Sequence, residues 1–193
     1  MMKSHVILVP GLADRKGIMD YLTRSWKKDV VVHIHPAPWE DMKPFGHKLE
    51  MLLKLIDHCA KHSGKVSLIG VSAGGSLVMN AFCHKKAKIH RVINICGRLR
   101  EGKNVSPTLD TAIKGHPSFK NSVLLCEKGL SKLTSLDKAK IMTIRALFDG
   151  TVPTSTTPIV GAINITIPFA FHIFAIGAAF LFYKKSMLQF IKE

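Results

Sequence analysis

Six short apolar runs divide the sequence, and segments with helical periodicity separate most of them. The runs are rich in Val and Ile and cover residues 5–9, 30–35, 65–71, 89–96, 139–148 and 162–171. Strands that alternate with helices are typical of a parallel sheet, and strands buried on both faces are continuously apolar. We therefore expect an α/β protein, a three-layer α/β/α sandwich with a mostly parallel six-stranded sheet.

Helical periodicity is clearest in residues 44–62. There the apolar residues recur at helical spacing and form one stripe: Phe45, Leu49, Leu52, Leu53, Ile56 and Cys59. Further helices are expected over 15–26, 74–83, 119–133 and 173–193, whereas the polar, Gly- and Pro-containing segment 97–118 is expected to be a loop.

Ligands of open parallel sheets bind at the carboxyl ends of the strands, so the residues that follow each strand are informative. Four such positions stand out after the expected strands: Gly11-Leu12, Ser72, Asp149 and His172. They give a short list of candidates for a functional site.

Ser72 lies in Gly70-Val71-Ser72-Ala73-Gly74, a G-x-S-x-G pattern between an expected strand and an expected helix. A serine hydroxyl is a weak nucleophile, which a sharp turn can present to a base. Such a turn leaves no room for side chains at Gly70 and Gly74, and the amides that begin the helix favour developing negative charge. A tight turn without chemistry remains the alternative.

Two phosphate-binding motifs fit this segment less well. A P-loop needs a lysine before the final Ser or Thr, and Gly75 stands before Ser76 instead. A dinucleotide-binding fingerprint needs a second glycine where Ser72 stands, and it normally follows the first strand of the sheet.

Asp149 and His172 follow the last two expected strands. A carboxylate at Asp149 could orient a histidine and stabilise its imidazolium form. Taken singly, Asp149-Gly150 could be a simple turn and His172 a core histidine. The chain order Ser72, Asp149, His172, each at a strand end, favours a catalytic triad of the Ser…Asp…His order.

The chain resembles a small member of the α/β-hydrolase superfamily, similar to serine esterases and lipases. The resemblance covers nearly the whole chain and is carried by "VILVPGL", "LIGVSAGGSLV" and "FDGTVP". It implies that Ser72 is the nucleophile, that His172 is the general base and then the acid, and that Asp149 is the partner of His172. It also implies an oxyanion hole formed by the backbone N–H groups of Leu12 and Ala73.

The same resemblance implies an architecture. It predicts one domain over residues 1–193 with strand order 2-1-3-4-5-6, in which the first two strands of the family are absent. The usual position of a cap holds only residues 97–134, so a large lid is not expected, and 173–193 is the C-terminal helix. No metal and no organic cofactor are expected, and the chain has no close Cys/His pairs of the kind that bind zinc.

The formal net charge of +15 is compatible with an anionic partner. The lysines are scattered and no nucleic-acid-binding motif accompanies them, so we expect no specific nucleic acid partner. The four cysteines (Cys59, Cys83, Cys96 and Cys126) have no regular spacing. We interpret them as buried free thiols in a reducing compartment, which predicts a cytoplasmic protein.

The segment from 150 to 183 contains no Asp, Glu, Lys or Arg, and residues 159–182 are long enough to span a bilayer. One alternative is therefore a tail-anchored or membrane-associated binding protein. In the hydrolase interpretation the run splits into a strand, with Pro168 on an edge, and a helix. Apolar residues of that helix then face the sheet: Ile173, Ile176, Phe180, Met187 and Ile191.

Phe174 and Leu181 remain on another face of that helix. This surplus of apolar surface suggests a homodimer contact, an anionic membrane surface or an acyl-binding surface. The favoured function is hydrolysis of a small-molecule carboxylic ester through an acyl-enzyme, with an acyl or lipid-like substrate. Esters, thioesters and amides share this machinery, and the sequence does not separate them.

Overall fold

The computed structural model describes residues 3–12, 16–112 and 116–193. Six strands form one sheet in the order β2-β1-β3-β4-β5-β6, and every neighbouring pair is parallel. The strands are β1 (His5–Val9), β2 (Val31–Ile34), β3 (Val66–Val71), β4 (Ile89–Ile95), β5 (Ile141–Phe148) and β6 (Ile163–Ala170). The predicted α/β class, the parallel sheet and the strand order are confirmed.

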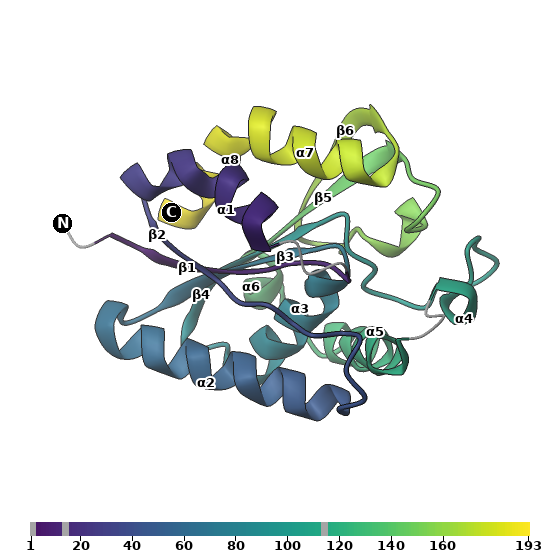
Figure 1. Ribbon diagram of the computed structural model, residues 1–193, viewed down its shortest axis with the longest axis horizontal. Coiled ribbons are helices and arrows are strands. Elements are labelled where there is room, and N and C mark those ends of the chain that lie inside the picture. Colours follow the sequence, from purple (N-terminus) through teal and green to yellow (C-terminus); the bar gives the residue numbers. More distant parts are fainter. Residues whose placement is uncertain (1–2, 13–15, 113–115) are drawn as a thin grey trace.

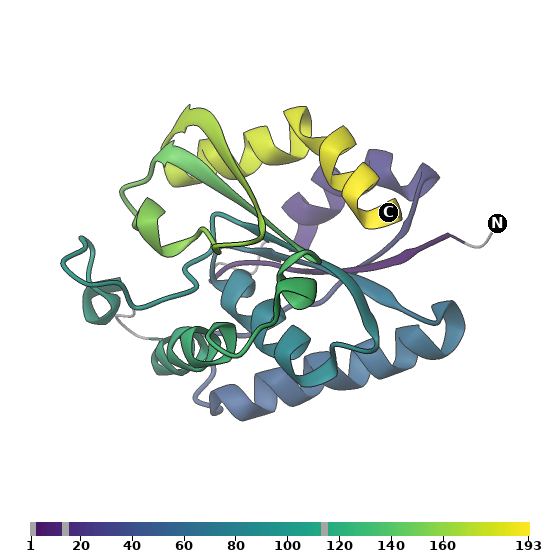
Figure 2. The ribbon, with the colours of Figure 1, turned by 180° about the vertical axis from the view of Figure 1, so that it is seen from behind.

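Helices cover both faces of this sheet (Figure 1). One face carries α1 (Lys16–Thr23), α7 (His172–Phe182) and α8 (Lys184–Lys192), and the other carries α2 (Phe45–Ser63), α3 (Ala73–Lys85) and α5 (Pro117–Leu130). The view from behind shows the same two layers (Figure 2). Shorter helices lie in the connections: η1 (Arg24–Lys28), α4 (Leu109–Ala112), α6 (Ser135–Lys138) and η2 (Thr154–Thr156).

Side chains of the inner strands enter two separate cores, one on each face of the sheet. In β1, Val6 and Leu8 pack toward α1, α7 and α8, whereas Ile7 and Val9 pack toward α2 and α3. Every residue of β3 is buried. Because both faces of the sheet are covered, the strands carry no polar alternation, and this gives the sequence its continuous apolar runs.

The helix predicted over 44–62 is confirmed as α2, and all of its predicted stripe except the partly buried Leu53 is buried. The helix predicted over 15–26 is shorter, because α1 ends at Thr23 and a 3-10 turn continues the chain; residue 15 lies outside the described residues. Within the loop predicted over 97–118, the structure adds the single turn α4.

The apolar run 159–182 folds into β6 and α7, and β6 is the edge strand that accommodates Pro168. None of the helices in the described ranges combines the length and the hydropathy that a bilayer crossing requires. The single helix predicted over 173–193 is two helices, because the chain turns at Tyr183.

The predicted inward face of this C-terminal segment is wrong at one position. Phe180, Met187 and Ile191 are buried and Ile176 packs against the same core, but Ile173 is 68% exposed. Phe174 and Leu181 are exposed, as expected.

Candidate active site

Ser72 occupies the sharp turn between β3 and α3. Its backbone has φ 52° and ψ −120°, a left-handed conformation that costs a non-glycine residue on the order of 1–3 kcal/mol. Its N–H donates to the carbonyl of Ile95 at 2.9 Å, and its own carbonyl accepts the N–H of Gly75 at 2.9 Å. These bonds hold the strained turn, which presents the Ser72 side chain beyond the carboxyl end of β3.

The glycines on either side of Ser72 lie in close backbone contacts. A Cβ atom at Gly70 would stand 2.5 Å from the Gly74 carbonyl oxygen, and one at Gly74 would stand 2.2 Å from the Val9 carbonyl oxygen. Both distances are far below van der Waals contact, so no larger residue fits without moving backbone. The crowding expected from the G-x-S-x-G pattern is present here.

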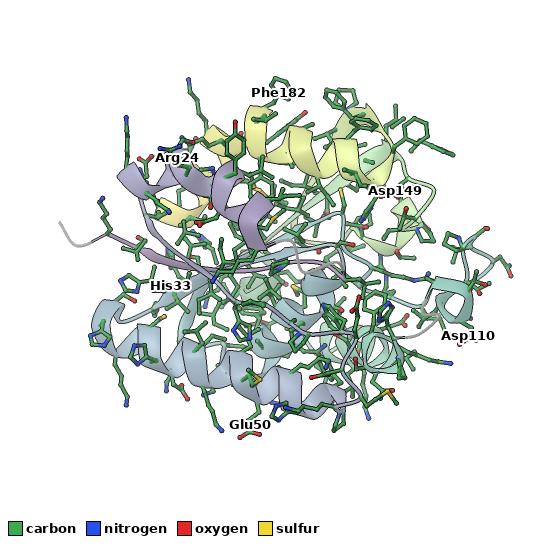
Figure 3. All side chains as sticks on the ribbon, in the orientation of Figure 1. Arg24, His33, Glu50, Asp110, Asp149 and Phe182 are labelled. Carbon is green, nitrogen blue, oxygen red and sulfur yellow. The ribbon has the colours of Figure 1, made fainter. Side chains whose placement is uncertain are left out.

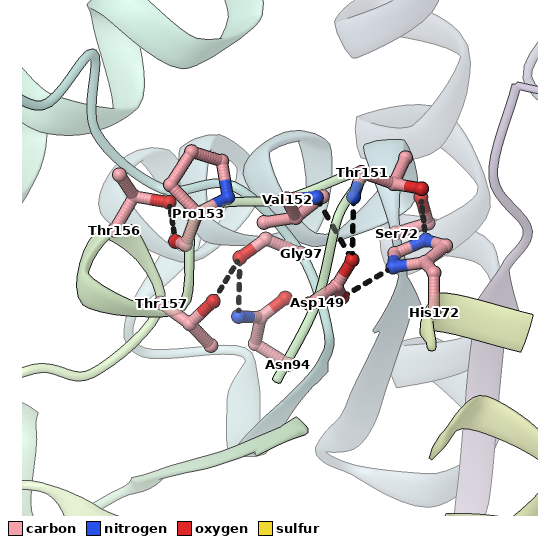
Figure 4. A network of polar contacts seen from close by, with 10 residues as sticks. All are labelled: Ser72, Asn94, Gly97, Asp149, Thr151, Val152, Pro153, Thr156, Thr157 and His172. Atoms are coloured by element: carbon pink, nitrogen blue, oxygen red, sulfur yellow. Dashed lines mark hydrogen bonds and ion pairs between the residues drawn. The ribbon is translucent and has the colours of Figure 1, made fainter. Parts of the chain in front are cut away.

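The three side chains at the strand ends meet in one hydrogen-bonded chain (Figure 4). His172 Nε2 lies 2.8 Å from Ser72 Oγ, and His172 Nδ1 lies 2.7 Å from Asp149 Oδ2. Residues 72, 149 and 172 are thus brought together from β3, β5 and β6.

Asp149 is only 8% exposed. Its Oδ1 accepts the N–H groups of Thr151 at 2.8 Å and Val152 at 3.0 Å. Burial raises the pKa of this carboxyl, but the hydrogen bond and charge of His172 and the two N–H donors outweigh it, so the pKa lies below its ordinary value. Asp149 is therefore an ionised acceptor near neutral pH.

This ionisation fixes the hydrogen positions along the chain of contacts. A carboxylate only accepts, so the hydrogen between Asp149 and His172 must be on Nδ1. In the neutral ring, Nε2 is then an acceptor, and the Ser72 hydroxyl donates to it. The arrangement can remove a proton from Ser72 and hold it on the imidazole.

His172 is the first residue of α7, and the junction before it is also strained. Phe171 has φ 69° and ψ 134°, in the region that favours glycine. Its N–H donates to the Phe148 carbonyl at 3.0 Å, and its carbonyl accepts the N–H of Ala175 at 3.0 Å. The end of β5 and the start of α7 thereby fix the backbone that carries His172.

Of the two residues predicted to form an oxyanion hole, Ala73 follows Ser72 in the chain and Leu12 lines the same cavity as Ser72. A Cβ atom at Gly11 would stand 3.0 Å from Ser72 Cβ, so the loop that contains Leu12 runs against the serine. Ala73 begins α3, where the first amides have no acceptor within the helix.

A cavity of about 430 Å³ opens beside the Ser72 and His172 side chains. Apart from the two polar side chains and Thr151, its walls are apolar or backbone. They come from the loop after β1, from α1, from Val71 and from α7: Pro10, Gly11, Leu12, Ile18, Met19, Leu22, Val71, Ile173, Ile176 and Gly177. The sequence analysis did not find this cavity, because α1 and α7 are far apart in the chain and meet only in the folded protein.

Cys96 is another residue that the sequence analysis did not connect with the site. It follows β4 directly, has φ 52° and is buried. Burial, and secondly the charge of Asp149, raises the pKa of the Cys96 thiol to about 12, so this thiol stays neutral and unreactive. All four cysteines are free thiols, as predicted, but the prediction that all are buried is wrong for Cys83, which is partly exposed.

Comparisons with known proteins yield no matching family model and no matching curated sequence. Solved structures do match. One matching structure comes from a study of carboxylesterases of the thaumarchaeon Nitrososphaera gargenis. It superimposes with a TM-score of 0.68 at 13% sequence identity, over 96% of this chain and 89% of that one. The structure of the enol-lactonase from Burkholderia xenovorans superimposes with a TM-score of 0.67 at 13% sequence identity, over 100% of this chain and 93% of that one.

Another matching structure comes from the study of the metagenome-derived lipolytic enzymes LipS and LipT. It superimposes with a TM-score of 0.67 at 11% sequence identity, over 97% of this chain and 91% of that one. At such identities the likeness concerns the fold. Together with the six parallel strands in the order 2-1-3-4-5-6, it shows that the protein has the α/β-hydrolase fold.

Proposed function

We propose that the protein is a serine hydrolase that cleaves carboxylic esters with an apolar acyl group. The observation that carries this proposal is the continuous chain of contacts from Ser72 Oγ through His172 to the ionised Asp149, at 2.8 and 2.7 Å. The solved structures of similar fold include proteins described as carboxylesterases and lipolytic enzymes, which supports ester hydrolysis.

The first half of the reaction forms an acyl-enzyme. Ser72 Oγ attacks the ester carbonyl carbon while its proton moves to His172 Nε2, and Asp149 stabilises the imidazolium that results. The negative charge on the carbonyl oxygen is held by the N–H groups of Leu12 and Ala73. As the ester bond breaks, His172 gives its proton to the departing alkoxide.

The second half releases the acid. A water molecule gives a proton to His172 Nε2 and attacks the acyl carbon, and the Ser72–acyl bond breaks as the proton returns to Ser72 Oγ. Asp149 stays ionised throughout, because its hydrogen bonds hold its pKa low. Its role is to keep His172 in the Nδ1–H tautomer.

The cavity supports an apolar acyl group as the substrate feature. Ile18, Met19 and Leu22 of α1 face Ile176 and Gly177 of α7 across this space, next to the serine. Burial of one CH₂ group stabilises binding by about 0.8 kcal/mol, which corresponds to about fourfold in affinity. We expect kcat/KM for p-nitrophenyl esters to rise by up to this factor per methylene until the cavity is full.

Gly177 offers a direct test of this acyl site. It lines the cavity, and a Cβ atom there would meet nothing within 4 Å. Gly177→Leu should therefore fold and fill the cavity, so that hydrolysis of long-chain esters falls at least tenfold while acetate hydrolysis is kept. Gly46→Leu is the matched control, because Gly46 is an exposed helical glycine with equally open surroundings.

If Gly177→Leu lowers the rates for all chain lengths equally, the cavity is not the acyl site. If the wild-type protein hydrolyses none of the esters, the proposal of ester hydrolysis fails as a whole.

We also propose that an anionic lipid surface is the partner of the apolar face formed by β6 and α7. The exposed residues of this β6–α7 face are Phe169, Phe171, Phe174, Leu181 and Phe182. Figure 3 shows Phe182 at the outer side of α7. The net charge of +15 complements anionic headgroups, and the face adjoins the cavity through α7.

A further inference from the structure

Two histidines and a cysteine meet on the face of the sheet that α2 covers. His5 begins β1 and His33 lies on β2, and the strand register pairs His5 with Val31 and Ile7 with His33. The two histidines are therefore diagonal neighbours on one face. Cys59 of α2 is buried against the same face.

Their ligand atoms have spacings that approach those of a tetrahedral metal site. His33 Nε2 lies 3.2 Å from His5 Nδ1, and one ring nitrogen of each histidine and the Cys59 sulfur all lie within 4.8 Å of one another. Zinc with Zn–N distances of about 2.0–2.1 Å and a Zn–S distance of about 2.3 Å requires about 3.3 Å between nitrogens and about 3.6 Å between nitrogen and sulfur. The sulfur needs to move by little more than about 1 Å.

The chemistry of the three groups selects among metal ions. Two imidazoles and one thiolate suit zinc, whereas magnesium and calcium require oxygen ligands. Both histidines are partly exposed, so an ion can reach the site from solvent, and Cys59 closes it from the core. Three protein ligands leave one position for water.

We propose that His5, His33 and Cys59 bind a zinc ion, with water as the fourth ligand. Binding releases the Cys59 thiol proton to solvent, because a coordinated thiol is deprotonated. The ion would tie edge strand β2 to β1 and α2. His33 and Asp149 lie toward opposite sides of the molecule (Figure 3), so this metal site is separate from the candidate active site and independent of the proposed function.

Short-range spacing in the sequence could not reveal this cluster, because its members are 28 and 26 positions apart along the chain, from residue 5 to 33 and from 33 to 59. Without a metal, the two rings can share a hydrogen bond and Cys59 can serve as an ordinary core residue. The experiment must therefore separate a metal site from a hydrogen-bonded pair.

Cobalt(II) titration of the purified apoprotein provides that separation. We expect one equivalent to bind with the visible bands of a tetrahedral site and a thiolate-to-cobalt band in the near ultraviolet, and zinc to displace it. Cys59→Ala should lose the thiolate band. Cys126→Ala removes a buried thiol from the same core and should keep the band.

Thermal unfolding gives a second measurement that does not depend on Cys59. Zinc should raise the Tm of the wild-type protein by several degrees relative to the protein in chelator. His33→Ala should abolish this shift, and His58→Ala, at an exposed histidine of α2, should preserve it. The absence of cobalt bands in the wild type, or an unchanged zinc shift in His33→Ala, would overturn the proposal.

Discussion

At the scale of single residues, the environment of Asp149 decides the state of the whole triad. Two backbone N–H groups and His172 hold this carboxyl ionised despite its burial. An ionised Asp149 places the hydrogen of His172 on Nδ1 and leaves Nε2 free to accept from Ser72. In the proposed mechanism, the reactivity of Ser72 therefore depends on a carboxylate that it does not touch.

Asp149→Asn should lower kcat/KM by about 10³- to 10⁴-fold, because the amide favours the wrong tautomer of His172. The variant should also change how stability depends on pH. The pKa of Asp149 is lowered by folding, so its stabilisation is complete above the unfolded value of about 3.9 and is lost as pH falls through the lower folded value.

Urea unfolding of the wild type and Asp149→Asn measures this effect. The gap between their free energies of unfolding should narrow below about pH 4, where Asp149 of the wild type becomes protonated. A gap that does not narrow below about pH 4 would show that folding does not lower the pKa of Asp149.

At the scale of elements, two junctions between a strand and a helix carry the site. The β3–α3 junction holds Ser72 at φ 52°, and the β6–α7 junction holds Phe171 at φ 69° directly before His172. Both conformations are unfavourable for residues with side chains, so the surrounding packing must supply the compensation. Two of the four non-glycine residues with positive φ in the described ranges therefore stand at the positions that present the two interacting side chains.

Much of this arrangement could be predicted from the sequence. Continuous apolar runs identified the six strands, and the rule that parallel strands end at one edge placed Ser72, Asp149 and His172 at that edge. The inward face of α7 could not be assigned in the same way. This helix is apolar on all sides, so periodicity does not favour one face, and Ile173 proved to be exposed.

Other features depend on tertiary contacts that no local pattern encodes. The cavity beside Ser72 needs α1 beside α7, and the cluster of His5, His33 and Cys59 needs β1, β2 and α2 together. Neither of these groupings of elements follows from the spacing of residues along the chain.

At the scale of the whole molecule, we expect the net charge and the β6–α7 face to act together in binding an anionic lipid surface. Within this face the rings of Phe169 and Phe182 stack at 6.0 Å, and those of Phe171 and Phe174 meet edge to face at 6.5 Å. Aromatic surface of this kind, on a chain with a net charge of +15, favours an anionic bilayer surface.

We expect the protein to sediment with phosphatidylglycerol vesicles more than with phosphatidylcholine vesicles, and less so as salt increases. Phe174→Ser with Leu181→Ser should reduce this binding at least tenfold. Met42→Ser with Leu136→Ser removes two other exposed apolar side chains and should not. If Phe174→Ser with Leu181→Ser leaves vesicle binding unchanged, and if the wild-type protein is a dimer that this variant no longer forms, the face is a homodimer contact instead.

The central claim is that Ser72 is a nucleophile activated by His172, and labelling with a fluorophosphonate probe tests it most directly. The folded wild-type protein should be labelled at Ser72, and Ser72→Ala should remain unlabelled. Ser76→Ala, which changes a buried serine in α3, should be labelled like the wild type. A folded wild-type protein that stays unlabelled, or a Ser72→Ala variant that is labelled equally, would contradict the claim.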